Sequence, residues 1–501
     1  MKLKVKDMDI ATGSTLVAIL NEEDAHKLDL HHEDRIKLKF KTRETTAVID
    51  IAQGKKSVPP GQIGLFEEVL KKLNIKQGNI IEIDLAEKPA SVYYIKDKIE
   101  GKHLKKEEID SIVKDIVSGK LSAIELTYFI GACYTKGMNT EETIALTKSI
   151  VKNGTQLKLD KRPILDKHCS GGVPGNRTTM LVVPIVAAAG FTIPKTSSRS
   201  ITSPAGTADT MEVFAPVALS VEQMKHVVKK TNGCIIWGGG VNLAAADDKL
   251  IRLRHPLSLD PEGMLLSSIL AKKAAVNATH VLIDIPIGRD TKIKTRSHAL
   301  KLKKSFKKIG KKLGMKIRVV ITLGSEPIGN GIGPALEAKD ILYILTRDEK
   351  RPIDLERKCI LIASQLLQMV GVRNARKKVI KILESGKAYE KMKEIIKAQG
   401  GNPNIKPDQI HVGEHSYTFK SPKSGIISDI DNFTINKIAR IAGAPKDKGS
   451  GIYIYRHQGD FVKKGDKIMT IYAENKIKLN YALNILRKIG GIVIDHTLVT
   501  Q

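Results

Sequence analysis

The pattern of hydrophobic and polar positions begins with short alternating stretches, which are typical of β-strands. Short helical segments are expected after Asn21 and after Gly61. The succession of strand, short acidic helix, turn and strand over 16–40 is typical of the repeat of a double-psi β-barrel. Residues 1–86 are therefore predicted to form an N-terminal β-barrel domain, with strands at 3–5, 14–20, 35–40, 45–51 and 80–83.

A helical pattern follows the polar, proline-containing stretch 87–91. Apolar residues recur with the i, i+3, i+4, i+7 spacing of one helix face between Ile109 and Ile116, and Gly119 is placed to end that helix. Further helices are expected over 121–133 and 141–151. We predict a helical subdomain over 87–160, joined by a helix near 260–276.

From residue 161 onward, short apolar runs alternate with amphipathic helices, as at 281–285 and 317–323. This alternation is typical of an α/β domain, which we place at 161–410. After residue 410 glycine-bounded apolar runs return, and 411–501 is predicted to be a β-rich hammerhead or sandwich domain. The fold class expected is therefore multi-domain α/β, with a β-rich domain at each end.

Composition narrows the class of partner. Lys and Arg total 83 against 54 acidic residues, a formal net charge of +29 in 501 residues. This charge favours phosphorylated metabolites, nucleic acid or an acidic membrane surface. Aromatic residues are only 4%, which argues against base stacking as the main mode of binding. The lysine-rich stretch 292–316 is interpreted as a solvated helix face, with a nucleic-acid patch as the alternative.

Cysteine usage and hydropathy indicate the compartment. The four cysteines lie far apart and form no CxxC pair, so a disulfide scaffold or cysteine-rich zinc site is not expected. The sequence shows no signal-peptide pattern and no apolar run of about 18 residues. No cluster has the spacing of metal ligands. We expect a cytoplasmic protein without a metal, a cofactor or a membrane span.

The segment 166–179 carries the first chemical signal. A short strand leads into a loop with Gly171, Gly172 and Gly175, and a helix is predicted to start near Thr178. Glycines let backbone N–H groups approach an anion, and the helix N-terminus adds partial positive charge. Lys167 adds a full charge, and hydroxyl groups come from Ser170, Thr178 and Thr179. The segment is predicted to bind phosphate, although it is not a Walker A loop; the alternative is a ligand-free βα turn.

A second group of hydroxyl side chains surrounds Arg199. Such a density of hydroxyls is unusual in a core and suits phosphate or ribose; the alternative is a polar surface loop with local caps. The two segments together favour a phosphorylated ligand. The second group consists of Ser197, Ser198, Ser200, Thr202, Ser203 and Thr207.

A third segment combines a carboxylate with a helix. Asp260 and Pro261 form a good start for the helix predicted at 264–275, so a capping role is the simplest interpretation of Asp260. Ser268 and Lys272 lie four residues apart on one face of that helix. A hydroxyl, an ammonium and a nearby carboxyl are suited to recognising a heterocyclic base.

These motifs resemble the pyrimidine nucleoside (thymidine) phosphorylase family, and most closely its archaeal branch, the AMP phosphorylases. The family's DKHSTGG-type motif corresponds to Asp166–Gly172, and its SILAKK helix corresponds to Ser268–Lys273. The resemblance covers the whole chain. It implies an additional N-terminal barrel that the bacterial members lack, and a homodimer or a larger homo-oligomer.

The resemblance also implies roles for individual residues. Asp260 matches the proton donor, and His168, Arg254 and Lys272 lie where the base or ribose is expected, with a structural role as the alternative for His168. Phosphate is expected at Lys167, Ser170, Thr179, Ser197 and Thr207. AMP is expected at Gly172, Ser198, Arg199, Ser200, Ile201, Thr202, Ser203, Thr207, Ser268 and Lys292.

The activity implied is conversion of AMP and phosphate into adenine and ribose 1,5-bisphosphate, with CMP and UMP as further substrates. Two departures from the thymidine enzymes affect it: Cys169 replaces a phosphate-binding serine, and the loop over 197–207 is rich in serine rather than glycine. The alternatives are a pyrimidine nucleoside phosphorylase, an anthranilate-type phosphoribosyltransferase, and a nucleic-acid-binding protein that uses the positive charge. No specific nucleic-acid partner is expected.

Overall fold

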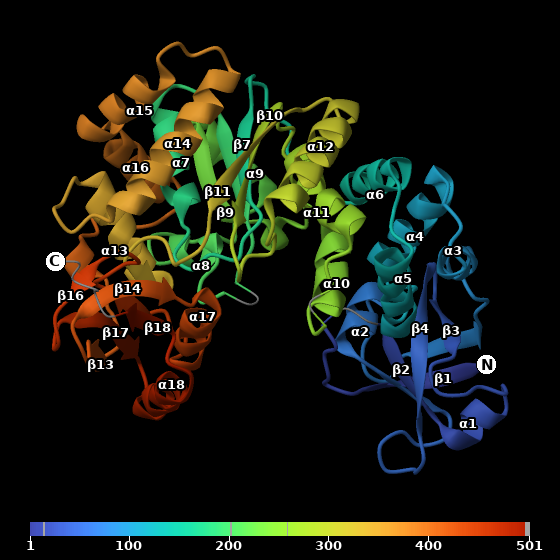
Figure 1. Cartoon of the computed structure of the whole chain (residues 1–501). Coiled ribbons are helices and arrows are strands. Elements are labelled where there is room, and N and C mark those ends of the chain that lie inside the picture. The colour runs from blue at the N-terminus through green and yellow to red at the C-terminus, as the bar shows by residue number, and fades with distance from the viewer. Residues whose placement is uncertain (14–15, 201–202, 258, 496–501) are drawn as a thin grey trace. The chain divides into compact units, whose positions relative to one another are not determined.

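The computed structural model describes residues 1–13, 16–200, 203–257 and 259–495 (Figure 1). It contains two compact units. One comprises Met1–Gly154 and Ala244–Ser268, and the other comprises Thr155–Leu243 and Ile269–Gln501. Within the described residues, no helix has the length and hydropathy to cross a membrane. The mixed α/β, multi-domain class predicted from the sequence is confirmed.

The first unit begins with a closed barrel of six strands in the order β1-β5-β2-β4-β3-β6. Alternate strand residues such as Leu20, Ile36 and Ile49 are fully buried, because every second side chain of a strand faces the barrel interior. The strands are β1 (Lys2–Asp7), β2 (Val17–Asn21), β3 (Arg35–Phe40), β4 (Arg43–Ala52), β5 (Gln62–Leu65) and β6 (Ile80–Leu85), with helices α1 (Glu22–His26) and α2 (Glu67–Leu73).

One element of the barrel differs from expectation. The helix expected after Gly61 begins only at Glu67, because Gln62–Leu65 forms strand β5. This strand runs parallel to β1 and antiparallel to β2. The segment is short and has no clear polar alternation, so only its two neighbouring strands identify it.

Helices complete the first unit. The predicted helix ending at Gly119 is observed, and Gly119 adopts φ 77°, which a residue without a side chain tolerates best. Ser122 and Asn139 accept hydrogen bonds from backbone N–H groups at the starts of α5 and α6. The helices are α3 (Ala90–Ile99), α4 (Lys106–Ser118), α5 (Ala123–Thr135), α6 (Thr140–Lys152) and α10 (Ala245–Arg254).

The second unit contains parallel strands. Strand β10 pairs in parallel with β7 and β11, and β8 pairs in parallel with β9. A parallel bridge between Ile164 and Thr192 connects the two groups of strands. The strands are β7 (Leu165–Cys169), β8 (Ile193–Ser197), β9 (Gly233–Trp237), β10 (His280–Ile287) and β11 (Lys316–Leu323).

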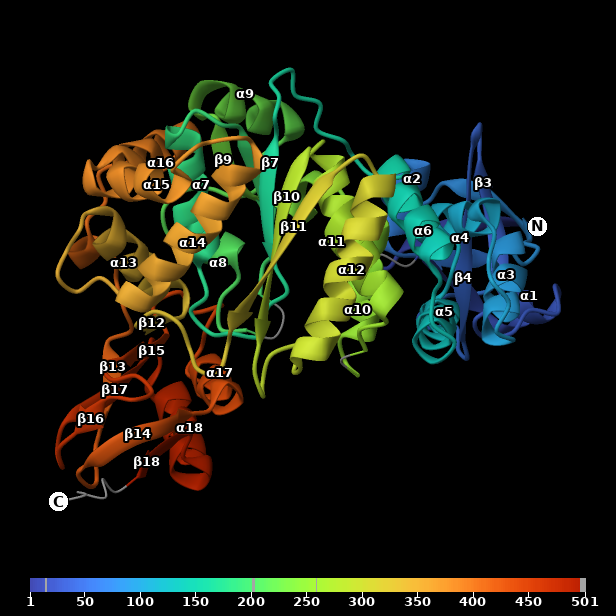
Figure 2. The ribbon, with the colours of Figure 1, turned by 45° about the horizontal axis from the view of Figure 1, so that its top comes forward.

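Helices cover this sheet on both faces (Figures 1 and 2). Helix α7 is apolar along nearly its whole length and is buried among α14 and α16, while α12 lies along β11. A helix that is apolar all round belongs in a core. The helices are α7 (Thr178–Ala188), α8 (Thr207–Met211), α9 (Val221–Thr231), α11 (Glu262–Ala275), α12 (Arg296–Lys312), α13 (Pro334–Leu345), α14 (Ile353–Met369), α15 (Ala375–Glu384) and α16 (Lys387–Ala398), with 3-10 turns η1 (Gly238–Val241) and η2 (Pro407–Gln409).

The C-terminal part of the second unit has its own apolar core. Two small antiparallel sheets, β12-β15-β17-β13 and β16-β14-β18, are packed with two helices that the strand-like pattern did not predict. The elements are β12 (Gly331–Ile332), β13 (His415–Lys420), β14 (Gly425–Ile430), α17 (Asn432–Ile441), β15 (Gly451–Ile454), β16 (Phe461–Val462), β17 (Lys467–Ala473), α18 (Lys476–Ile489) and β18 (Ile492–Asp495).

Candidate active site

The glycine-rich loop after β7 has the geometry of an anion-binding turn. Gly171, Gly172 and Gly175 adopt φ values of 90°, 96° and 69°, which side-chain-bearing residues rarely adopt. Helix α7 starts at Thr178, so the loop leads directly into a helix N-terminus. Unpaired N–H groups and the helix dipole both favour an anion at this position.

Gly172 also brings a distant segment to this loop. A Cβ atom at Gly172 would lie 2.7 Å from the Cα of Thr291 and 2.9 Å from the backbone nitrogen of Lys292. No side chain fits between these two stretches of backbone. The backbone of Lys292 is therefore held beside the loop, as expected for a residue assigned to the same ligand.

Two hydroxyl groups beside the loop have no hydrogen-bond partner among the described residues. Ser170 Oγ and Ser197 Oγ are both buried, and Asn176 Oδ1 is in the same state. Thr179 is buried as well. A buried polar atom without a partner costs free energy, so such atoms concentrate where a ligand completes them. Asn176 was missed by the sequence analysis, although it follows Gly175 directly.

Lys167 lies in the interior below the loop. Its side chain is 1% exposed, and Nζ donates a hydrogen bond to Thr178 Oγ1 at the start of α7. Burial lowers the pKa of the Lys167 ammonium from its usual value of 10.5. The residue places a weakly solvated cation next to the helix N-terminus, where it reinforces the attraction for an anion.

His168 faces a cluster of buried charges. Asp166 accepts a 2.6 Å hydrogen bond from Lys273 Nζ, and Lys195 Nζ lies 3.7 Å from its other oxygen. Burial, followed by the positive charges of Lys273 and Lys195, holds the pKa of His168 well below 6.5. His168 is therefore a neutral imidazole at neutral pH. Asp166 begins the DKHSTGG-type motif, but Lys195 carried no clear signal in the sequence, because only the neighbouring parallel strands bring the two residues together.

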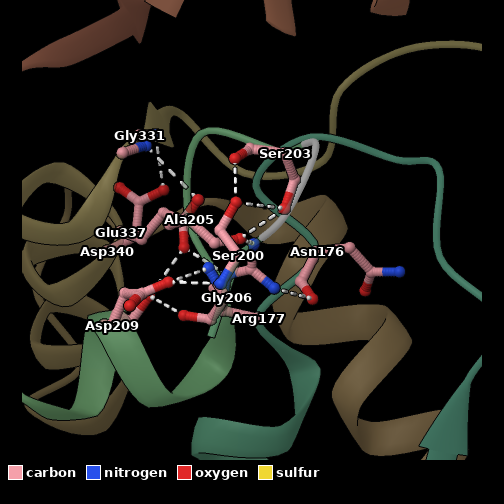
Figure 3. Close-up of polar contacts among 12 residues, drawn as sticks. Asn176, Arg177, Ser200, Ser203, Ala205, Gly206, Asp209, Gly331, Glu337 and Asp340 are labelled. Atoms are coloured by element: carbon pink, nitrogen blue, oxygen red, sulfur yellow. Dashed lines mark hydrogen bonds and ion pairs between the residues drawn. The ribbon is translucent and has the colours of Figure 1, made fainter. Parts of the chain in front are cut away.

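The serine-rich loop is shaped by Asp209, which was not predicted (Figure 3). One oxygen of this carboxylate accepts the backbone N–H of Ser200 at 2.7 Å and that of Gly206 at 2.8 Å. Ser200 Oγ donates to the carbonyl of Ser203, and Ser203 Oγ donates to that of Ala205 at 2.9 Å. Several hydroxyls expected to hold nucleotide thus also organise the loop itself.

Arg177 fixes the far end of the same loop (Figure 3). Its guanidinium donates to the carbonyl of Ala205 and to the carboxylate of Glu337. Thr210 Oγ1 donates to the same carboxylate at 2.8 Å. Burial raises the pKa of Glu337 from its usual 4.5, and the pairing with Arg177 opposes this rise. These contacts connect the loop to helix α13.

The remaining predicted nucleotide residues have different surroundings. Ser198 and Lys292 are exposed, and Lys272 is half-buried. Thr207 is the first residue of α8. The guanidinium of Arg199 is partly exposed and contacts Glu212 and Asp209. Ile201 and Thr202 lie outside the described residues.

Three predicted residues belong to the first unit. Helix α11 begins at Glu262, and Asp260 lies two residues before it. Asp260 Oδ1 lies 3.9 Å from Arg254 Nε, and Arg254 is buried. Ser268 Oγ donates to Asp247 Oδ2 at 2.7 Å. The structure thus groups the phosphate and loop residues in the second unit, and Arg254, Asp260 and Ser268 in the first.

Family models match three segments of the chain. Residues 92–154 match the helical bundle domain of the glycosyl transferase family, and 161–258 match its a/b domain. Residues 426–492 match the pyrimidine nucleoside phosphorylase C-terminal domain. A solved anthranilate phosphoribosyltransferase from Thermus thermophilus is similar with a TM-score of 0.50 and 18% identity, covering 61% of this chain and 98% of that one. This likeness shows the fold alone.

Curated relatives extend over nearly the whole length. The AMP phosphorylase of Thermococcus kodakarensis is 45% identical over 498 residues, which cover 99% of this chain and 98% of that protein. The AMP phosphorylase of Thermofilum pendens is 44% identical, covering 99% and 96%. That of Methanococcoides burtonii is 43% identical, covering 100% and 99%. On this similarity, the chain belongs to the AMP phosphorylase family.

Proposed function

We propose that the protein catalyses phosphorolysis of AMP to adenine and ribose 1,5-bisphosphate. The observation that carries this proposal is the pair of buried, unpartnered hydroxyls of Ser170 and Ser197 beside a glycine loop and a helix N-terminus. They are suited to donate hydrogen bonds to inorganic phosphate, with the charge of Lys167 nearby. The AMP phosphorylase relatives support AMP as the second substrate.

The reaction exchanges one bond at the ribose. A phosphate oxygen forms a bond to C1′ while the bond from C1′ to adenine N9 breaks, and the bonding electrons leave with the base. Because the phosphate is already bound in position, the reaction does not have to bring it together with C1′, and this lowers the activation barrier. Asp260 is assigned to donate a proton to the departing adenine, and this role is a proposal.

The other residue roles are proposals of the same kind. Phosphate is assigned to Lys167, Ser170, Thr179, Ser197 and Thr207. Neutral His168, with Arg254 and Lys272, is assigned to the ribose and base. AMP is assigned to Gly172, Ser198, Arg199, Ser200, Ile201, Thr202, Ser203, Thr207, Ser268 and Lys292.

Several finer assignments complete the proposal. CMP and UMP are further substrates, the protein is cytoplasmic, and it forms a homodimer or a larger homo-oligomer. We retain the boundaries 1–86, 87–160, 161–410 and 411–501, the double-psi topology of the barrel and the hammerhead character of the last domain. No metal or cofactor takes part.

A direct assay tests the function. The purified protein is incubated with AMP, adenosine, CMP or thymidine, with and without inorganic phosphate, and the released base is measured. We expect adenine release from AMP that depends on phosphate and exceeds release from adenosine and thymidine. Faster release from thymidine would favour a pyrimidine nucleoside phosphorylase instead. Phosphate-independent release would exclude phosphorolysis.

The unpartnered hydroxyls give a second expectation. Ser170→Ala and Ser197→Ala should each raise the KM for phosphate about 10-fold, because each removes one hydrogen bond to a charged ligand. The thermal unfolding temperature should not fall, since neither hydroxyl has a hydrogen-bond partner among the residues that the structure describes. As a matched control, Ser364→Ala removes a buried hydroxyl that bonds the carbonyl of Ile360 and should leave the phosphate KM unchanged. Loss of stability without a change in phosphate KM would contradict the assignment.

A further inference from the structure

Glu212, just after helix α8, joins the serine-rich loop to the C-terminal β-rich region. Its carboxylate accepts two hydrogen bonds from Arg199, at 2.8 Å from Nη1 and 2.6 Å from Nη2. Lys448 Nζ lies 3.2 Å from the same carboxylate. Lys448 follows α17, so the side chain of Glu212 connects Arg199 to a residue more than 200 positions later in the chain.

Arg199 continues this connection into the loop. Its Nη1 also contacts Asp209 at 3.2 Å, and Asp209 accepts the backbone N–H groups of Ser200 and Gly206 (Figure 3). The guanidinium lies 5.0 Å from the centroid of the Trp237 ring, a cation–π contact. The N–H groups of Arg199 thus donate to the carboxylates of Asp209 and Glu212, and these contacts fix the loop.

A second contact joins the same two regions. Arg440 on α17 donates from Nη1 to the carbonyl of Ser203 at 3.2 Å. The carbonyl of Lys448 in turn accepts the backbone N–H of Ala335 near the start of α13. The first contact places the cationic side chain of Arg440 at the edge of the loop, and the second joins the backbone of Lys448 to α13.

We propose that Glu212 is a positioning residue for nucleotide binding, and that the C-terminal region belongs to the nucleotide site through Lys448 and Arg440. The inference rests on the proposed function, because that function assigns the loop to AMP. Arg199, which is assigned to AMP, is then held in position by Glu212 and Asp209. A loop already held in its binding shape loses less conformational entropy when the ligand binds.

The charge state of Glu212 supports ion pairs with Arg199 and Lys448 that persist at every physiological pH. Pairing with Arg199, and then with Lys448, lowers the pKa of Glu212 to about 2, so the carboxylate is charged at all physiological pH values. The three side chains are partly exposed, so each ion pair contributes modestly to the stability of the fold. The effect of breaking the connection should therefore appear in nucleotide binding more than in unfolding.

The experiment compares Glu212→Gln with a surface control, Glu390→Gln, whose carboxylate contacts Lys393 on its own helix. Trp237 is the single tryptophan of the chain and its ring contacts Arg199, so we expect its fluorescence to change when AMP binds at the loop. We expect Glu212→Gln to weaken AMP binding and raise the KM for AMP about 5- to 10-fold, as for loss of about 1 kcal/mol. The KM for phosphate should change less than 2-fold, and the control should match the wild type.

Lys448 variants separate positioning from a general loss of structure. Lys448→Met should raise the KM for AMP in the same direction, and Lys448→Arg should restore it, because the guanidinium also pairs with a carboxylate. The double variant with Glu212→Gln should be no worse than the poorer single variant. Additive losses, or an equal rise in the KM for phosphate, would overturn the proposal.

The outcome is distinguishable from failure of the proposed function. If the wild type binds AMP but releases no adenine, the function fails, and the tryptophan titration still decides the role of Glu212. If AMP binding in Glu212→Gln equals that of the wild type, the positioning role is wrong while the function stands. Failure of the wild type to bind AMP overturns both.

Discussion

Asp260→Asn should lower kcat for AMP phosphorolysis by about 10²- to 10⁴-fold, the usual contribution of a general acid. Departure of adenine places negative charge on the base, and the amide cannot neutralise it by releasing a proton. The KM for phosphate should stay within about 2-fold, because Asp260 belongs to the first unit and the phosphate residues to the second. Steady-state kinetics with base release as the signal measures both quantities.

The pH dependence makes the test specific. The variant should lose the part of the pH profile of kcat that reflects ionisation of the acid. Asp97→Asn is a matched control, since its carboxylate is about as exposed as that of Asp260 and pairs with Lys102 on the surface. A pH profile identical to that of the wild type would exclude Asp260 as the proton donor.

Lys167→Met should lower kcat/KM for phosphate by about 10²- to 10³-fold. The ammonium is buried next to the helix N-terminus, where a fixed charge stabilises an anion far better than in water. Methionine nearly preserves the volume, so the loop should keep its shape. Initial rates over a range of phosphate concentrations at saturating AMP give the result.

Lys167→Met should also change how the free energy of unfolding depends on pH. Because burial lowers the pKa of Lys167, the unfolded chain binds more protons than the folded chain between that lowered pKa and 10.5. The free energy of unfolding contributed by Lys167 therefore rises with pH across this window. Lys167→Met should remove this rise and be at least as stable as the wild type at neutral pH. Chemical denaturation at several alkaline pH values checks the slope.

An equally buried lysine provides the control. Lys98 is 1% exposed and pairs with buried Glu142 at 2.7 Å. Lys98→Met leaves that carboxylate unpaired and should cost about 3–5 kcal/mol of stability without affecting the KM for phosphate. If both lysine variants changed phosphate kinetics equally, the effect of Lys167 would reflect general loss of structure.

The regular elements were predicted well where the local pattern was strong. The strand over 35–40 was predicted with the bounds that the structure has, and α7 was expected to begin where it does, at Thr178. Strand β5 and helices α17 and α18 were not predicted. Their short apolar runs fit a helix or a strand equally well, and only packing against neighbours decides between the two.

The residues of the candidate site were likewise predicted only where the local sequence pattern was strong. The glycines of the phosphate loop could be recognised because positive φ values restrict the residue type at each position. Asp209, Glu212 and Lys195 could not, because a carboxylate or lysine between apolar residues is equally compatible with solvent exposure. Their importance depends on partners from distant segments, such as Lys448 for Glu212.

The sequence by itself determined the class of fold, the glycine loop and the family motifs, since all three depend on neighbouring residues and their backbone preferences. Tertiary structure decided which charges are buried and which side chains they meet. It gave Arg199 the partners Glu212 and Asp209, and it left Ser170 Oγ and Ser197 Oγ without partners among the described residues. The physical reason is that desolvation and pairing depend on the chain as a whole, which no local pattern records.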